Sequence, residues 1–503
     1  MQRSLSDFIG RLLVNAAGKT NVSSAAASFP SAAIISQYPF FGIFSRFFFR
    51  NLFHINELTN RCSRDRQKGR IMLQIIQEAN NFIWGLPLLI VLMGTHLYFT
   101  CKLHMPQRRI LYAIKLSLGM EDTGDKNLSP FSALATTLAA TLGTGNIIGV
   151  STAVALGGAG AVFWCWITGI LGMATSYAEC YLSVLFRSRR QDGTYVGGPM
   201  YVLQNGLHNR TLGSFYAFCT LIAAFGAGCA TQANSATQAA TQSFKLSPHF
   251  IGILLAVVTG TVILGGVKAI GNLCERIVPA ISFIYLFGCF LLLCLYHGQL
   301  LDACLLIIKD AFSFSSVAGG FAGSAIQMSL RYGIARGLFT NEAGIGTSAI
   351  AAAASGTNDP KHQAYVSMTA VFWDTVVMCL VTGIVIVANM LYDPASVQGI
   401  PATGLTSAAF SHLPYVGDAF LTVSLIAFAV TTLIGWSYFG EKATEYLVGN
   451  KGIPYYKLLY ILMIYLGAII PMNLVWECTD LINGFMAIPN IIALFFLRRY
   501  VRP

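Results

Sequence analysis

The stretch that decides the fold is TLGTGNIIGV, residues 141 to 150, which lies inside one of the longest apolar runs of the chain. It contains three glycines in ten residues, and each glycine in a helix interior costs about 1 kcal/mol relative to alanine. A membrane-spanning helix with this sequence is weakened near its middle. A helix break at Gly143–Gly145 is one explanation for such a sequence.

The rest of the chain has the composition of a polytopic helical membrane protein. Of its 503 residues, 55% are hydrophobic and 11% are charged, whereas a soluble domain carries about 25% charged residues. Apolar runs of transmembrane length recur, with charges mostly in the connections. The twelve cysteines are scattered singly and predict buried thiols, because no C-x-x-C pair is present.

Apolar runs and turn signals predict about eleven transmembrane helices. The expected ranges are 81–102, 129–156, 160–187, 212–240, 249–266, 275–297, 333–355, 363–390, 416–447, 455–470 and 471–498. The segment 313–332 is expected to be a re-entrant or interfacial piece before helix 7.

The charges of the loops predict the orientation. The loops after helices 1, 3, 5, 7, 9 and 11 carry eighteen Lys and Arg, whereas the opposite loops carry Lys245 and Lys309. Positive residues gather on the cytoplasmic side of a membrane. We therefore expect a cytoplasmic C-terminus, an outside start of helix 1, and a location in the cell (inner) membrane.

Residues 1–71 do not fit this orientation, because they hold ten Lys and Arg against three acids. Three explanations are an over-long gene model, a removable Arg/Ser-rich targeting segment and a disordered tail. We favour Met72 as the functional start, since the stretch 72–85 contains no cation. The transporter domain would then be 72–503, and no nucleic-acid partner is expected.

A break at Gly143–Gly145 has a chemical use. In lipid, irregular backbone is tolerated only where it lines a cavity inside the protein. Amide N–H groups freed at the start of the second half-helix can bind a carboxylate, and carbonyls freed from the first half can coordinate a cation. The alternative is close helix packing around small residues, which the motif taken alone slightly favours.

A second glycine-rich interruption changes that balance. Helix 7 reads RYGIARGLFTNEAGIGTSAIAAAA, residues 331–354, with Gly344 and Gly346 beside the polar pair Asn341-Glu342. A matched pair of interrupted helices in two halves of a chain is the best sequence indication of a secondary-transporter site. The organisation therefore favours transport.

The two interruptions also define a repeat. Helices 2–6 (about 129–297) and helices 7–11 (about 313–498) number five each, with the interrupted helix first in both. Because five is odd, the second set runs with inverted topology, so the two breaks face each other near the bilayer midplane. The predicted fold is all-α, a 5+5 inverted repeat behind one extra N-terminal helix.

Several motifs carry a family resemblance. They occur in one order between residues 72 and 498: GTGNIIGV, GGAGAVFWCW, GGPMY, RGLFTNEAGIG, VFWDT, IGWSYFGEKATEYLVG and LVWECTDLINGFMAIPN. Together they resemble the alanine/glycine:cation symporter family. The resemblance implies a LeuT-like inverted-repeat fold and sodium-driven uptake of alanine or glycine. Ala159 and Ala364 depart from the proline and glycine usual in that family, and both lie at helix ends.

The first break supplies the predicted site for the substrate carboxylate. The ligands are the backbone N–H groups of Thr144 and Gly145, since glycine at 143 and 145 lets a ligand approach closely; Gly143 belongs to the same site. Asn341, in the helix 7 break, and Gln232, in the polar stretch ATQANSATQ of helix 4, are predicted to bind polar groups of the substrate. For Gln232 the alternative is an interhelical hydrogen bond.

Sodium requires hard oxygen ligands from carbonyls and hydroxyls. The resemblance to LeuT-like proteins points to the carbonyls of Ala139 and Leu142 and to the hydroxyls of Thr431 and Thr432. The alternative for each threonine is a hydrogen bond back to its own helix. No cofactor other than the transported sodium ion is expected.

Asp374 is the most informative charge of the predicted helices. It lies about 16 Å deep at 1.5 Å per residue, where an ionised carboxylate costs at least about 2.5–3.5 kcal/mol. Its alternative roles are to ligate a second cation with Asn146, to carry a proton, or to orient the helix 7 break. Arg336 and Glu342 are expected to pair across that break in a gating or coupling role. Three further acids are expected near cytoplasmic helix ends: Glu179, Glu441 and Glu445.

These features predict symport of sodium and a small neutral amino acid across the lipid bilayer by alternating access. The alternatives are a proton-coupled carrier of the same fold and, from another class, a channel through the broken helices. An enzyme is not expected, because no nucleophile–base pair appears and GTGN lacks the Lys-Ser/Thr of a P-loop.

Overall fold

The computed structural model describes residues 74–503 apart from 81, 120–126, 313–323 and 471–472. The chain divides into two compact units, Met1–Ile75 and Ile76–Pro503, and nearly all the described residues belong to the second. The expected extension at 1–71 and the expected start at Met72 lie outside the described residues.

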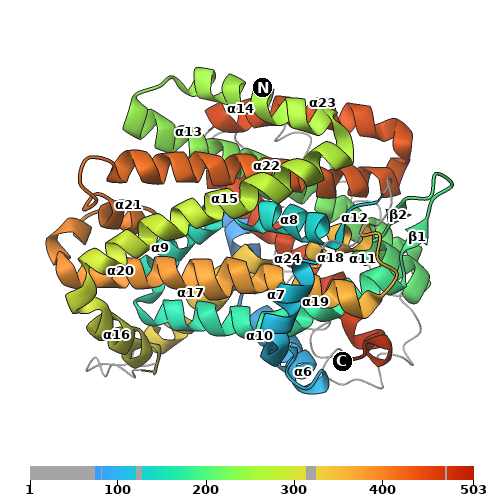
Figure 1. Cartoon of the computed structure of the whole chain (residues 1–503), viewed down its shortest axis with the longest axis horizontal. Helices are drawn as coiled ribbons and strands as arrows, with labels where there is room; N and C mark the ends of the chain where they lie inside the picture. Colours follow the sequence, from blue (N-terminus) through green and yellow to red (C-terminus); the bar gives the residue numbers. More distant parts are fainter. Residues whose placement is uncertain (1–73, 81, 120–126, 313–323, 471–472) are drawn as a thin grey trace. The chain divides into compact units, whose positions relative to one another are not determined.

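The second unit is built of helices joined by loops (Figure 1). The α-helices are α6 Leu86–Lys102, α7 Ile110–Ser117, α8 Pro130–Thr141, α9 Ile148–Gly157, α10 Gly160–Leu185, α11 Pro199–Tyr201, α12 Arg210–Phe225, α13 Thr231–Phe244, α14 Pro248–Leu264, α15 Gly266–Leu295, α16 Leu300–Phe312, α17 Ser324–Asn341, α18 Ser348–Ala353, α19 Pro360–Val371, α20 Leu380–Tyr392, α21 Leu405–Phe410, α22 Gly417–Val448, α23 Ile453–Ile469 and α24 Asn473–Phe496. Strands β1 (Ser188–Arg189) and β2 (Tyr195–Val196) form an antiparallel hairpin after α10.

Two long helices contain a π-helical turn. The turn η4 (Gly226–Ala230) joins α12 to α13, and the turn η6 (Phe372–Cys379) joins α19 to α20. Such turns are rare and occur frequently at functional sites. Both stand in helices that carry predicted site residues, Gln232 in α13 and Asp374 in η6.

Within the described residues, seven helices are long and apolar enough to cross a membrane, and the number is nine if two bent pairs each count as one span. The bent pairs are Pro87–Lys102 with Pro106–Ser117, at 63°, and Pro130–Thr141 with Thr144–Gly157, at 58°. Each of the eleven expected ranges contains helix. The second bent pair is the helix that the sequence predicted to break.

Some boundaries differ from the expectation. The start expected for helix 7 at 333 is wrong, because α17 is helical from Ser324; residues 313–323 of the expected re-entrant or interfacial piece lie outside the described residues. The chain turns at Gly265–Gly266, where φ of Gly266 is +77°, and α15 resumes at once rather than at 275. Four helices occupy stretches expected to be loops: α7, α11, α16 and α21.

Cap residues fix where two of the helices start. The Ser129 hydroxyl accepts a hydrogen bond from the Ser132 N–H at 2.9 Å, ahead of Pro130. Asp359 accepts from the Lys361 N–H at 2.9 Å, at the start of α19. Side-chain acceptors of this kind satisfy N–H groups that have no partner within the helix, and proline in the first turn has no N–H to leave unpaired.

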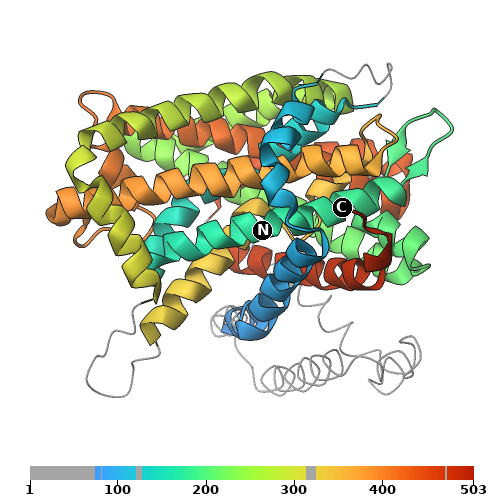
Figure 2. The ribbon, with the colours of Figure 1, turned by 60° about the horizontal axis from the view of Figure 1, so that its bottom comes forward.

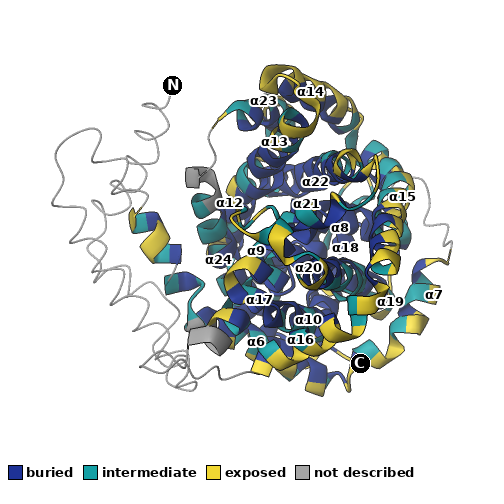
Figure 3. Cartoon of the chain, turned by 90° about the vertical axis from the view of Figure 1, so that its left-hand side faces the viewer, coloured by how far each residue is buried: buried dark blue, intermediate teal, exposed yellow. Residues whose placement is uncertain are grey.

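α8 and α22 lie in the interior of the unit. Almost every residue of α8 is buried, and α22 is buried on most of its turns from Leu421 to Glu445. The outward faces of α14 and α15 are exposed instead (Figure 3). Their exposed side chains include Phe250, Leu254, Phe283 and Phe287, and large apolar side chains are what a face toward lipid requires.

α10 packs along α17 and α19 (Figure 2), and the basic loops meet at one end of these helices. The Lys102 ammonium donates to the Arg498 carbonyl, and Arg187 Nη1 donates to the Ser355 carbonyl at 2.6 Å. Ion pairs join the same end of α22 to its neighbours: Glu441 to Lys457 at 3.1 Å, and Glu445 to Arg190. Loops that the sequence placed on one side of the membrane therefore share one end of the unit.

Gly435 of α22 sets how closely α22 approaches α8. A Cβ at Gly435 would lie 2.6 Å from the backbone N of Ala140. We expect Gly435→Ala to lower the thermal unfolding temperature of the protein in detergent. Gly94→Ala is the control, because a Cβ there meets nothing within 4 Å and alanine favours helix by about 1 kcal/mol. Equal unfolding temperatures for the two variants would contradict the packing argument.

Candidate functional site

The first helix break lies between α8 and α9, where the sequence predicted it. The Gly143 N–H donates to Asn146 Oδ1 at 3.0 Å. It does not bond the Ala139 carbonyl, four residues back, as it would in a continuous helix. The Ala139 carbonyl, which is predicted to bind sodium, therefore does not accept a hydrogen bond from the Gly143 N–H.

Asn146 joins this break to η6. Its Nδ2 donates to Asp374 Oδ1 at 2.7 Å and to the Asp374 carbonyl at 3.2 Å. The other carboxylate oxygen of Asp374 accepts from the Thr375 hydroxyl at 2.7 Å. The structure therefore brings together Asn146 and Asp374, which the sequence paired as one alternative.

Gln232 of α13 reaches the same break. Its Oε1 accepts from the Thr144 hydroxyl at 3.0 Å and from the Thr144 N–H at 3.4 Å. Its Nε2 donates to the Ala227 carbonyl at 3.4 Å. The Gln232 oxygen thus lies at the amide group that was predicted to hold a substrate carboxylate.

α22 brings one of its two predicted threonines to the end of α8. Thr432 Oγ1 donates to the Leu142 carbonyl at 3.2 Å. Thr431 Oγ1 instead donates to the Phe428 carbonyl of its own helix at 2.9 Å. Thr432 and Leu142 therefore place two hard oxygen atoms side by side, whereas Thr431 adopts the intrahelical bond.

The second break separates α17 from α18. Three residues of this break have positive φ: Glu342 at +55°, and Gly344 and Gly346 at +92°. Asn341 Oδ1 accepts from the Ala343 N–H at 3.0 Å. Asn341 Nδ2 is buried and has no hydrogen-bond partner among the residues that the structure describes, so it is an unused donor at a predicted substrate position.

The two breaks lie against each other. A Cβ at Gly145 would lie 2.9 Å from Thr340 Cγ2 and 3.7 Å from Phe339 Cδ1, in the last turn of α17. A Cβ at Gly143 would lie 2.7 Å from Thr432 Oγ1. The glycines therefore allow α17 and α22 to touch the bare backbone of the first break.

The expected ion pair between Arg336 and Glu342 is not formed. The Glu342 carboxylate accepts from the Thr347 hydroxyl across the second break. The Arg336 guanidinium lies over the Phe339 ring, 5.8 Å from its centroid. Glu342 is turned toward α18 by the positive φ at its own position, which separates it from a guanidinium on α17.

The predicted site is enclosed in this conformation. Thr144 and Asn146 are 1% exposed, Asn341 is 2% exposed and Gln232 is 6% exposed, while Asp374 is fully buried. A ligand can reach these groups only if helices move.

Sequence reasoning missed three side chains that contact the second break. Glu179 of α10 accepts from the Gly344 N–H at 2.8 Å, and Tyr216 of α12 donates to the Ile345 carbonyl at 2.9 Å. Asn490 of α24 donates to the Gly344 carbonyl at 2.9 Å. Glu179 is 2% exposed and lies six residues before the end of α10; the sequence placed it towards a cytoplasmic helix end and did not assign it to the second break. Its position inside the apolar run of helix 3 was the available signal.

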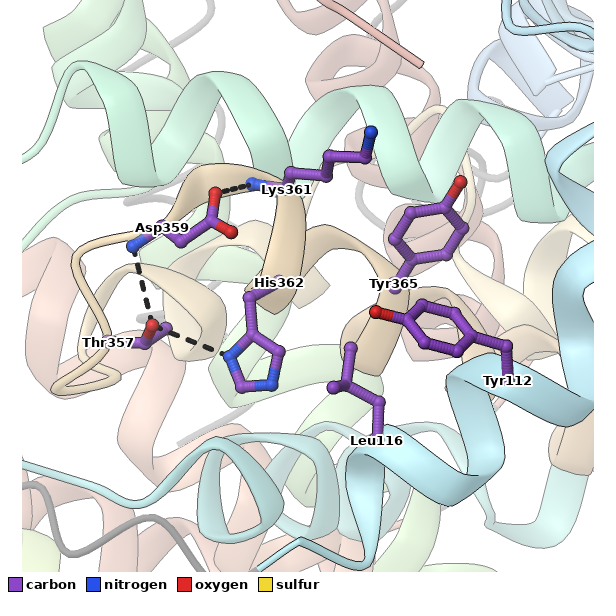
Figure 4. Close-up of a pocket in the computed structure, with 7 residues that line it drawn as sticks. All are labelled: Tyr112, Leu116, Thr357, Asp359, Lys361, His362 and Tyr365. Carbon is purple, nitrogen blue, oxygen red and sulfur yellow. Dashed lines mark hydrogen bonds between the residues drawn. The ribbon is translucent and has the colours of Figure 1, made fainter.

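A separate pocket lies between α7 and the start of α19 (Figure 4). It is lined by Tyr112, Leu116, Thr357, Asp359, Lys361, His362 and Tyr365. The Asp359 N–H and the His362 ring approach the Thr357 hydroxyl at 3.3 and 3.4 Å. None of the residues predicted for amino acid or sodium lines this pocket, so it is distinct from the helix breaks.

A comparison with known families identifies the chain. The model of the sodium:alanine symporter family matches residues 69–502. The chain belongs to this family. It is therefore a multi-pass membrane protein and a cation-coupled amino-acid symporter, and the family resemblance of its motifs is confirmed.

Curated relatives of this family member are transporters. It is 41% identical over 432 residues to the sodium/alanine symporter AgcS of Methanococcus maripaludis, covering 84% of this chain and 94% of that protein. It is 34% identical to the probable sodium/glutamine symporter GlnT of Bacillus subtilis, covering 86% and 90%. It is 31% identical to the putative sodium/proton-dependent alanine carrier protein YrbD of the same organism, covering 85% and 90%.

A solved structure shares the fold. The outward-open, substrate-bound state of a Na⁺-coupled sialic acid symporter matches with a TM-score of 0.54 at 12% identity, over 82% of this chain and 87% of that chain. At this identity the match shows the fold alone.

Gly143 tests whether the first break needs bare backbone. We expect Gly143→Ala to reduce amino-acid uptake at least about tenfold, because its Cβ would lie 2.7 Å from Thr432 Oγ1 and 3.3 Å from Gln232 Oε1. Gly149→Ala, in α9, is the matched control, since a Cβ there meets nothing within 4 Å. Uptake into proteoliposomes measures both, and normal uptake by Gly143→Ala would contradict the predicted site.

Proposed function

We propose that this family member takes up a small neutral amino acid, alanine or glycine, together with sodium, by alternating access. The observation that carries the proposal is the pair of adjoining helix breaks. They bring freed N–H groups, freed carbonyls and Asn341 Nδ2, which has no partner among the described residues, into one enclosed place. A zwitterion and a cation require this combination of donors and acceptors.

The substrate carboxylate binds at the Thr144 and Gly145 N–H groups, at the start of η2 and α9. Gln232 Oε1 accepts from Thr144 in this structure. When the substrate binds, a carboxylate oxygen replaces Gln232 Oε1 as the acceptor of this hydrogen bond. The side-chain amides of Gln232 and Asn341 then donate hydrogen bonds to the substrate. Its ammonium group faces the end of α17, where helix carbonyls carry partial negative charge. The Thr340 carbonyl is available there, because the Gly344 N–H donates to Glu179.

Sodium binds between the end of α8 and α22. Its proposed ligands are the carbonyls of Ala139 and Leu142 and the hydroxyls of Thr431 and Thr432. The 3.2 Å contact between Thr432 Oγ1 and the Leu142 carbonyl supports this position, since two oxygens at that separation can contact one cation. Thr431 has to release its intrahelical bond to Phe428 before it can join them.

The helices are proposed to form a LeuT-like 5+5 inverted repeat behind α6. The first set would run from α8 to α15 and the second from α17 to α24. The gathering of basic loops at one end supports a cytoplasmic C-terminus and an outside start of the first span. Arg336 and Glu342, which are not paired here, are proposed to act in gating through their separate partners.

Proton coupling is the second candidate, because Asp374 is a fully buried carboxyl without an ion pair among the described residues. Its alternative role is to ligate a second cation together with Asn146. The relative named a putative sodium/proton-dependent alanine carrier supports testing both ions.

Uptake of labelled alanine and glycine into proteoliposomes tests the function. We expect accumulation only under an inward sodium gradient, and exchange of preloaded for labelled substrate, which a channel does not catalyse. Accumulation driven by a proton gradient without sodium would favour the second candidate. Absence of accumulation under either gradient would contradict amino-acid symport.

Thr432 tests the sodium position. We expect Thr432→Val to raise the sodium concentration for half-maximal uptake about tenfold, equivalent to about 1.4 kcal/mol, because valine keeps the shape and removes the oxygen. Thr444→Val is the control, since the Thr444 hydroxyl bonds the Gly440 carbonyl within α22, away from the break. An equal sodium dependence of the two variants would refute the assignment.

A further inference from the structure

The second break is held by side chains from outside its own helix. Glu179 Oε1, on α10, accepts from the Gly344 N–H at 2.8 Å and from Asn490 Nδ2 at 2.6 Å. Asn490 Nδ2, on α24, also donates to the Gly344 carbonyl at 2.9 Å. The backbone N–H and the carbonyl of Gly344 are therefore both held by side chains from α10 and α24, two helices that are distant in the sequence.

The backbone at this position needs such support. Gly344 has φ of +92°, and a Cβ there would lie 2.5 Å from Leu92 Cδ2 of α6. Glycine can adopt this positive φ without strain, but its backbone can also adopt many other conformations. The hydrogen bonds of Gly344 with Glu179 and Asn490 stabilise the observed conformation over the others that glycine can adopt.

The hydrogen bond between Glu179 and Gly344 also affects the Thr340 carbonyl at the end of α17. In a continuous helix the Gly344 N–H would donate to the Thr340 carbonyl, four residues back. Because the N–H donates to Glu179, the Thr340 carbonyl at the end of α17 lacks this helical hydrogen bond. Without the Glu179 acceptor the Gly344 N–H would be a buried donor that has lost its partner, which destabilises this conformation of the break.

We propose that Glu179 is a positioning residue for amino-acid binding: it acts through Gly344, holds the second break open, and does not touch the substrate. The inference rests on the proposed function, because it assumes that the end of α17 and Asn341 bind the amino acid. The proposed sodium position at α8 and α22 has no contact with Glu179 and should be independent of it.

The role needs an acceptor oxygen and not a charge. Only Oε1 of Glu179 is engaged, and Oε2 is buried without a hydrogen-bond partner among the described residues. A glutamine has the same length and keeps the acceptor at Oε1. Glu179→Gln should therefore rescue what Glu179→Ala loses.

The experiment compares three variants in proteoliposomes. We expect Glu179→Ala to raise the KM for the transported amino acid about tenfold, as loss of a buried hydrogen bond implies, and Glu179→Gln to stay within about twofold of the wild type. Asn389→Ala is the control, because Asn389 is fully buried and accepts from the Tyr296 hydroxyl at 3.0 Å, on α20. We expect its KM to be unchanged.

A second readout separates positioning from a general loss of structure. Sodium alone, without amino acid, should raise the unfolding temperature of Glu179→Ala by as much as that of the wild type. If Glu179→Ala cannot be purified, Asn490→Ala replaces it, with a rise in KM expected in the same direction. Asn490→Ala removes the hydrogen bond that α24 donates to the Gly344 carbonyl.

Three results would overturn the inference while wild-type uptake is intact. They are an unchanged KM in Glu179→Ala, a defect in Glu179→Gln as large as that in Glu179→Ala, and loss of the sodium-induced stabilisation in Glu179→Ala. Absence of uptake by the wild type would instead refute the proposed function.

Discussion

The amide of Asn146 keeps α8 and α9 from forming one continuous helix, and the arrangement of the first break depends on it. Its oxygen takes the N–H of Gly143, and its nitrogen is fixed by the carboxylate of Asp374 in η6. Each buried polar group left without a partner would cost about 1–3 kcal/mol. Because both ends of the amide are satisfied by the protein, the break is stable before any ligand binds, and the backbone groups that meet the ligand are already in place.

The two breaks are stabilised in different ways. The first is held largely by a residue of its own motif, three positions after Gly143. The second is held by Glu179 and Asn490, which are 165 and 146 positions away from Gly344. The backbone of the first break is thus bonded within its own motif, while Asp374 of η6 fixes the other end of the Asn146 amide; the backbone of the second break at Gly344 is bonded by two distant helices. Asn341 and Glu342 accept hydrogen bonds from Ala343 and Thr347 within the second break, but the polar groups of Gly344 are bonded by side chains of other helices.

This difference also explains how much the sequence could predict. Glycines in apolar runs located both breaks, and the family motifs identified the family. The start of α8 at Pro130 was predicted to within one residue, whereas α19 starts at Pro360, three residues before the expected 363. The earlier starts of α15 and α17 were not predicted, because a helix that leaves the membrane keeps its hydrogen bonds while its composition turns polar. The ion pair expected between Arg336 and Glu342 failed for a related reason, since the backbone conformation of Glu342 follows from the tertiary packing around the break. Glu179 lies in an apolar run whose pattern gives no indication of what it contacts.

The enclosure of the site has an electrical consequence. With the groups around both breaks almost entirely shielded from solvent, no ion can pass along them in this conformation. Passage then needs packed helices to rearrange in every cycle, and motions of this kind take microseconds to milliseconds. A membrane that contains many copies of such a protein can keep its voltage and its ion gradient, because the copies in this state conduct no current.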